Sequence, residues 1–185
     1  RQRQMCIRDI FHTDIRIIDK NGLDVKPDQP GEILIRGRHV MKEYWNNPKA
    51  TQETLKDGWL HSGDIATMDK DGFIYIKDRL KDMIISGGEN VYPAEIENVI
   101  LSHEKVRDVA VIGQASPKWG ESPLAIVVKK SESLTAEEIM AFCVGKLARF
   151  KLPKAVEFAE VIPRNPSGKA LKRELRKNFT AGTSE

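Results

Sequence analysis

Cysteine is scarce in this sequence, and long apolar runs are missing. Only two cysteines occur among 185 residues. Cys143 falls in a stretch with helical periodicity, and Cys6 is far from it in the sequence, so we do not expect a disulfide framework. No run reaches the roughly 18 apolar residues of a membrane-spanning helix, and no apolar signal-peptide core follows the N-terminus. We therefore expect a cytoplasmic protein without a transmembrane segment, and leave peripheral attachment to a membrane open.

A charge excess of one sign is also missing. Lys and Arg number 30 against 27 Asp and Glu, which gives a formal net charge of +3. Nucleic-acid binding usually needs a clustered positive field, so we expect no nucleic-acid partner. The four histidines, at positions 12, 39, 61 and 103, do not have the spacing of metal ligands. We therefore expect no metal site and interpret His61 as a structural hydrogen-bonding residue.

The first 78 residues are predicted to be mostly β-structure. Strands are predicted at residues 14–19, 32–36, 65–68 and 73–77, because β-branched or alternating residues gather there between turn formers. Asp69-Lys70-Asp71-Gly72 is a strong hairpin signal between the last two. Pro48 to Leu55 predicts one or two helical turns capped by Asn47.

After Lys81 the pattern changes, because apolar strands alternate with helical periodicity. Strands are predicted at residues 106–113, 124–128 and 156–162. One helix is predicted to open at Tyr92-Pro93, a second to follow the capping box Thr135 to Glu138, and a third to span residues 170–178. We place a boundary near Asp78 to Lys81. The expected fold class is α+β: the end of a β-rich, barrel-like subdomain, followed by a small α+β domain with a three-stranded sheet and flanking helices.

Three loops carry polar or glycine-rich residues that a packed core does not require. In the first, residues 57–64, Asp64 could accept two hydrogen bonds from a vicinal diol, because a carboxylate has two oxygens. A turn with a capping acid is the alternative. The second runs from residue 78 to 90. Its paired glycines, Gly87 and Gly88, let another molecule lie against the backbone. A simple β-turn, with Arg79 and Lys81 as surface charges, is the alternative there.

The third loop, residues 163–169, is rich in Pro and Gly and ends at Lys169. A lysine in such a loop is usually a solvated surface residue. Where it has a function, a mobile ammonium is suited to neutralising two anions that are brought together, such as a carboxylate and a phosphate.

Together with Gly31-Glu32-Ile33-Leu34-Ile35-Arg36-Gly37, these loops resemble the adenylate-forming (AMP-binding) family. That family includes acyl-CoA synthetases, aryl-CoA ligases, luciferases and adenylation domains of peptide synthetases. The resemblance covers about residues 14 to 178 and rests on four motifs in one order. It implies that residues 12–78 end a large N-terminal domain, that 79–82 form a hinge, and that 83–179 form a small mobile domain, with a tail at 180–185. Residues 1–11 match nothing in the pattern, and we leave them unassigned as foreign or mistranslated sequence.

The resemblance also implies roles for single residues. Asp64 looks like the aspartate that holds the ribose hydroxyls of ATP, and Arg79 like the arginine that assists it. Lys169 resembles the catalytic lysine of the small domain, which contacts the α-phosphate and the acid's carboxylate. Lys81 matches the hinge position. The segment Gly87-Gly88-Glu89 matches the turn beside which the pantetheine arm of coenzyme A runs.

The reaction implied is the activation of a carboxylic acid by ATP, with Mg²⁺, and transfer of the acyl group to coenzyme A. Asn90 stands where acetate-type members carry arginine, which argues against the short-chain acetate branch. Residues 87–93 look more like fatty-acyl and aryl-acid ligases, and we expect a medium- or long-chain fatty acid. The family's phosphate loop and acid pocket are not found among these residues. We interpret the start at Arg1, without an initiator Met, as a truncation. We therefore expect the missing N-terminal part to hold the Mg²⁺ site, and residues 1–185 alone to be inactive.

Two alternatives stay open. Within the family, the acid could be loaded onto a carrier protein instead of coenzyme A. Outside it, the chain could be a non-catalytic binding module that uses a basic helix to hold an acidic partner or nucleic acid. That helix carries Lys169, Lys172, Arg173, Arg176 and Lys177. A solvated helix face, with Leu171 and Leu175 packed inward, is the simpler interpretation of that helix.

Overall fold

The computed structural model describes residues 12–180. The chain divides between Lys81 and Asp82 into two compact units, residues 1–81 and residues 82–185, and each is described by itself. The unassigned start, residues 1–11, and the tail beyond residue 180 lie outside the described residues.

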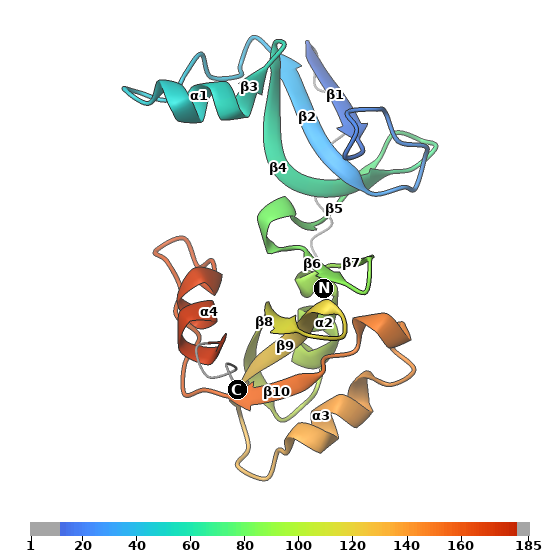
Figure 1. Cartoon of the computed structure of the whole chain (residues 1–185), viewed down its shortest axis with the longest axis vertical. Helices are drawn as coiled ribbons and strands as arrows, with labels where there is room; N and C mark the ends of the chain where they lie inside the picture. Colours follow the sequence, from blue (N-terminus) through green and yellow to red (C-terminus); the bar gives the residue numbers. More distant parts are fainter. Residues whose placement is uncertain (1–11, 181–185) are drawn as a thin grey trace. The chain divides into compact units, whose positions relative to one another are not determined.

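The first unit is an antiparallel sheet of five strands with one short helix (Figure 1). Its elements are β1 (Thr13–Ile18), β2 (Gly31–Gly37), α1 (Pro48–Thr54), β3 (Leu55–Lys56), β4 (Trp59–Met68) and β5 (Ile74–Arg79). The strand order is β1-β2-β4-β3, with β5 paired to β4. As predicted, Asn47 caps α1 by accepting a hydrogen bond from the backbone N–H of Ala50.

Strand β4 is longer than the sequence predicted. Residues 57–64 were expected to form a loop, but β4 already begins at Trp59 and pairs with both β2 and β3. On β2, the apolar residue Leu34 pairs with His61, and Ile35 pairs with Leu60. Pairing with residues distant in the sequence therefore overrides a local composition of Gly, Ser and Asp that disfavours strands.

The second unit is α+β, as expected. It contains β6 (Ile84–Ser86), β7 (Glu89–Val91), α2 (Pro93–Leu101), β8 (Val106–Ser116), β9 (Gly120–Lys129), α3 (Ala136–Cys143), β10 (Ala155–Phe158) and α4 (Lys172–Thr180). The strand order is β10-β9-β6-β7, and β8 pairs with β9. Strand β10 is parallel to β9, and the other pairs are antiparallel.

The three expected strands are present as β8, β9 and β10, but the sheet has five strands, so the expectation of three was too low. The additional pair is the hairpin of β6 and β7. Each of these strands spans only three residues. Such a length shows no readable alternation, and the hairpin joins the sheet through the pairing of Ser86 with Gly120, far along the chain.

Both faces of this sheet are covered. On β8, Val109 and Val111 join the core on the side of α2 and α3, whereas Ala110 and Ile112 join a second core that includes Leu175 of α4. This alternation follows from the period of two along a strand. Helix α4 thus covers one face, and it follows directly after the loop that carries Lys169. In the part of the chain that the structure describes, no helix is both long and apolar enough to cross a bilayer.

Candidate functional site

Asp64 and Arg79 lie directly opposite each other on β4 and β5. Arg79 Nε is 2.9 Å from Asp64 Oδ1, and the two side chains are 44% and 28% exposed. The ion pair holds one carboxylate oxygen in a fixed place. Because an ionised carboxylate offers about four acceptor positions, Asp64 retains acceptor capacity for the hydroxyls of a diol. The two residues predicted to act together on ribose are therefore brought together.

A β-bulge sets the position of Asp64. Ser62, Gly63 and Asp64 all lie opposite Ile33 of β2, where the register shifts. The Ser62 hydroxyl donates to the carbonyl of Ile33 at 2.8 Å and accepts from the backbone N–H of Asp64 at 3.1 Å. Gly63 has φ of +69°, a conformation that costs residues with a Cβ about 1 kcal/mol or more. The bulge turns Asp64 into register with Arg79.

The carboxylate of Glu32 braces the same bulge, and sequence reasoning gave this residue no role. It accepts a hydrogen bond from the backbone N–H of Gly63 at 3.1 Å, and His61 Nδ1 lies 3.0 Å from its other oxygen. Because a carboxylate can only accept, Nδ1 of His61 carries the hydrogen. His61 therefore has the structural role that was predicted. The signal that the sequence offered for Glu32 was a carboxylate at the start of a mostly apolar predicted strand.

The paired glycines form the turn of the β6–β7 hairpin, in which Ser86 pairs with Glu89. Gly87 and Gly88 have φ of +61° and +87°, as a tight two-residue hairpin turn requires. A side chain on Gly87 would meet the ring of Trp119 at 2.8 Å, whereas Gly88 faces open space. Glu89 is exposed. The turn is thus present in this segment, and its exposed side has room for another molecule.

Lys169 lies in an exposed loop between β10 and α4. Asn165 organises this loop: its side-chain oxygen accepts from the backbone N–H of Lys169 at 2.9 Å, and its own N–H donates to the carbonyl of Lys169 at 2.9 Å. Among residues 12–180, the ammonium of Lys169 has no ion-pair partner. Its backbone is held in place while its charge points to solvent.

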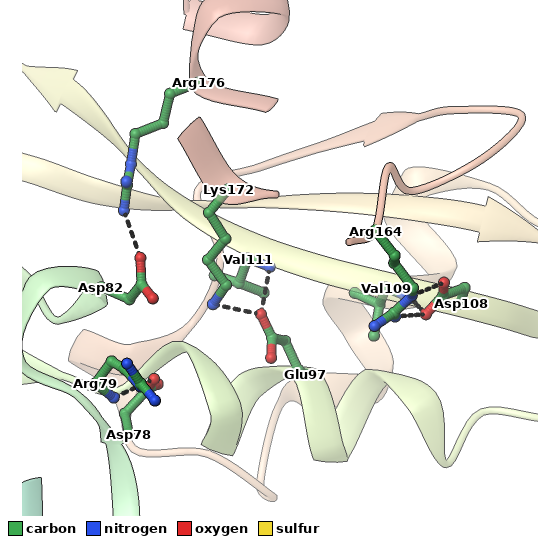
Figure 2. A network of polar contacts seen from close by, with 10 residues as sticks. All are labelled: Asp78, Arg79, Asp82, Glu97, Asp108, Val109, Val111, Arg164, Lys172 and Arg176. Carbon is green, nitrogen blue, oxygen red and sulfur yellow. Dashed lines mark hydrogen bonds and ion pairs between the residues drawn. The ribbon is translucent and has the colours of Figure 1, made fainter. Parts of the chain in front are cut away.

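Ion pairs tie this loop and α4 to the rest of the second unit, as Figure 2 shows. The pairs are Arg164 with Asp108, Lys172 with Glu97 and Arg176 with Asp82. Glu97 also accepts from the backbone N–H of Val111 at 2.8 Å. Sequence reasoning missed these acidic partners because each lies more than 50 residues away. The pairs also weaken the binding-module alternative, since Lys172 and Arg176 already have partners within the chain.

Lys81 is the remaining predicted site residue. Lys81 is exposed and lies in the short 3-10 turn Leu80–Asp82, at the boundary between the units. Cys143 is a free, buried thiol whose pKa is raised above its ordinary value of 9.0, mainly by burial. Burial and a raised pKa both disfavour the reactive thiolate form.

Part of the chain matches a known protein family. Residues 95–169 match the family model described as AMP-binding enzyme C-terminal domain. This match places residues 95–169 in the C-terminal domain of AMP-binding enzymes. The matched stretch begins within α2 and ends at Lys169, the lysine that the sequence singled out.

Curated relatives of this chain include CoA ligases. It is 49% identical to the long-chain-fatty-acid–CoA ligase FadD13 of Mycobacterium tuberculosis (strain ATCC 25618 / H37Rv), over 94% of this chain and 34% of that protein. It is 49% identical to a feruloyl-CoA synthase of Amycolatopsis sp, over 91% of this chain and 35% of that protein. The chain thus spans about a third of the length of these relatives.

A solved structure has the same architecture. It is the o-succinylbenzoate CoA synthetase (MenE) from Bacillus subtilis in complex with its acyl-adenylate intermediate, OSB-AMP. The TM-score is 0.84 at 40% identity, over 90% of this chain and 34% of that one. Both the β-rich unit and the α+β unit fall within the matched portion, because 90% of the chain aligns.

Proposed function

We propose that this chain is the C-terminal portion of an ATP-dependent acyl-CoA synthetase. The proposed reaction joins a carboxylic acid to ATP, giving an acyl-adenylate and pyrophosphate. The acyl group then passes to the thiol of coenzyme A, and AMP is released. ATP would enter as its Mg²⁺ complex, with the metal held by the N-terminal part. The observation that carries the proposal is the loop of Lys169. Asn165 holds the backbone of this loop, and the ammonium of Lys169 has no ion-pair partner among the residues that the structure describes.

The first step needs such a cation. A carboxylate that attacks the α-phosphate meets like-charge repulsion, and a positioned ammonium lowers this barrier while it holds the reactants in line. Lys169 is proposed to supply that charge. Asp64 is proposed to hold the ribose hydroxyls of the nucleotide, with Arg79 fixing its carboxylate at 2.9 Å. Together these residues bind the nucleotide and neutralise the charge that develops at its α-phosphate.

The second step is proposed to use the β6–β7 turn. The pantetheine arm of coenzyme A would run along the exposed side of Gly88, where a Cβ would meet nothing within 4 Å in this chain. Glu89 is exposed beside it. Because Lys169 and this turn would serve successive steps, the second unit would rotate between them about the segment 79–82, with Lys81 absorbing the backbone change.

For the acid, we propose a medium- or long-chain fatty acid. The support is the 49% identity with a long-chain-fatty-acid–CoA ligase. A feruloyl-CoA synthase is equally similar, at 49%. The full-length enzyme should therefore be given fatty acids of several lengths, ferulic acid and o-succinylbenzoic acid. We expect the highest kcat/KM with a fatty acid, which gives a fatty acyl-CoA. A higher kcat/KM with either aromatic acid would overturn this choice.

Replacing Lys169 tests the reaction itself. In the full-length enzyme, Lys169→Ala should lower the adenylation rate, measured as pyrophosphate exchange, by about 100-fold or more, because the charge stabilising the transition state is lost. Thioester formation from a supplied acyl-adenylate should be largely retained. Residues 1–185 alone should show no exchange and provide the blank.

The outcomes of this test are distinct. Equal loss of both steps would contradict the role given to Lys169. Acyl transfer only to a carrier protein, with none to free coenzyme A, would replace the ligase with the carrier-loading alternative. Tight binding of nucleic acid with a steep salt dependence would favour the binding module.

A further inference from the structure

Arg164 makes an unusually complete set of contacts at the base of the Lys169 loop. Its Nη2 donates to Asp108 Oδ1 at 2.7 Å, and its Nε donates to Asp108 Oδ2 at 3.3 Å. Its third contact is a hydrogen bond from Nη1 to the backbone carbonyl of Gly168 at 2.7 Å. One planar guanidinium thus joins a strand of the sheet to the peptide group directly before Lys169. Figure 2 shows its pairing with Asp108.

The anchor on the sheet is itself held in place. Asp108 lies in β8, and its Oδ1 also accepts a hydrogen bond from the backbone N–H of Val109 at 2.9 Å. The neighbouring residues Val109 and Ala110 are 5% and 0% exposed, so the strand is packed on both faces at this point. A bidentate pair between a guanidinium and a carboxylate adds geometric specificity as well as energy. Asp108 is therefore held in place, and it in turn fixes the position of the Arg164 guanidinium.

The other end of the contact is the exposed loop. Arg164 and Ala170 form an antiparallel bridge, and between them the chain turns back through Gly168. Asn165 already closes this turn from within. That closure fixes the shape of the loop but does not attach the loop to the sheet. The hydrogen bond to the Gly168 carbonyl supplies the attachment, one peptide away from Lys169.

We propose that Arg164 is a positioning residue for adenylation, acting through Asp108 and the Gly168 carbonyl to hold Lys169 in its working place. This inference rests on the proposed role of Lys169. Exposed ion pairs add little to stability, and Arg164 is 40% exposed. Displacing a catalytic group by about 1 Å can cost as much as 100-fold in rate. The effect of Arg164 therefore falls on catalysis rather than on folding.

The experiment uses the full-length enzyme and measures the two half-reactions separately. Arg164→Gln should lower kcat for adenylation by roughly 10-fold to 100-fold. The KM for ATP should change little, and thioester formation from supplied acyl-adenylate should be retained. Asp108→Asn should have a similar effect, and the double variant should be no worse than either single variant, because both changes break one pair. Arg149→Gln is the matched control, because Arg149 is exposed and has no partner among the described residues.

A merely electrostatic or structural role gives different results. Arg164→Lys keeps the charge but cannot make the three-way contact, so it should restore little of the rate. Full rescue by lysine would overturn the inference, as would a normal adenylation rate in Arg164→Gln. Hydrogen exchange should be faster in residues 165–169 alone, with an unchanged melting temperature. Faster exchange throughout the second unit would also overturn it.

Lys169→Ala, measured in parallel, separates this inference from the proposed function. If Lys169→Ala abolishes adenylation while Arg164→Gln does not affect it, only the inference on Arg164 fails. If Lys169→Ala leaves adenylation intact, the proposed function fails, and the inference on Arg164 fails with it.

Discussion

The carboxylate of Glu138 has Lys105 and His103 as close neighbours. It accepts from Lys105 Nζ at 2.9 and 3.2 Å, and His103 Nε2 lies 3.5 Å away. The hydrogen bond from Lys105 is the main reason that the pKa of Glu138 is lowered below its ordinary value of 4.5. Burial opposes this shift, and the nearby charges of Lys105 and His103 add to it.

This lowered pKa predicts how stability depends on pH. A carboxyl group whose pKa is lower in the folded state stabilises the fold above its ordinary pKa, and that contribution is lost as pH falls through the folded value. Glu138→Gln should therefore have a lower melting temperature than the unchanged chain at pH 7. The difference should shrink below about pH 4. Thermal unfolding across this range checks it, and a difference independent of pH would contradict it.

At the scale of elements, α4 is held in place by one buried side chain and by charged ones around it. Leu175 is 1% exposed and packs into the core with Ile112 and Ile126. Lys172 and Arg176 on the same helix reach Glu97 and Asp82 at 2.8 and 3.3 Å. The Lys172–Glu97 pair is mostly buried, with side chains only 12% and 24% exposed, so it docks the helix together with the apolar contact of Leu175.

Leu175→Ala should accordingly destabilise the second unit. Truncation of a fully buried leucine costs about 2–5 kcal/mol, because transfer energy is lost and a cavity remains. Leu101 in the same unit is 49% exposed, so Leu101→Ala is a matched control that should cost less than about 1 kcal/mol. Urea denaturation measures both values. Similar losses for the two variants would show that α4 is not docked through Leu175.

At the scale of the whole molecule, the chain changes from one compact unit to the other within a short turn. Lys81 is exposed and lies in the 3-10 turn Leu80–Asp82, which contains no buried residue. Asp82, the next residue, is tied to Arg176. A rotation between the two half-reactions would therefore be absorbed at Lys81 and the residues before it.

Lys81→Pro in the full-length enzyme tests this proposal. Proline fixes φ and disfavours the helical conformation of the preceding residue, so the turn can no longer move freely. The thioester-forming step should be slowed more than adenylation. Lys81→Ala, which removes the ammonium without restricting φ, should retain both steps. Stopped-flow measurements of each half-reaction compare the variants, and normal overall turnover in Lys81→Pro would remove the case for a hinge there.

Local features were predictable from the sequence, because the residues that define them also make their contacts. Asn47 caps α1 and Thr135 caps α3 through side chains three residues from the N–H groups they accept from. Asp69 accepts from the N–H groups of Asp71 and Phe73, which closes the predicted hairpin between β4 and β5. The roles of Asp64 and Lys169 stay predictions, which rest on the type and order of the motif residues.

What only the tertiary structure decided involves partners distant in the sequence. The β6–β7 hairpin joins its sheet through Gly120, and Arg164 meets Asp108 across 56 positions. Glu32 braces the bulge of Asp64 from a strand about 30 residues earlier. Neither periodicity nor turn chemistry encodes such contacts, since they form only when packed strands bring the groups together. The sequence by itself determined which residues are suited to the chemistry, and the folded chain decided which neighbours hold them in position.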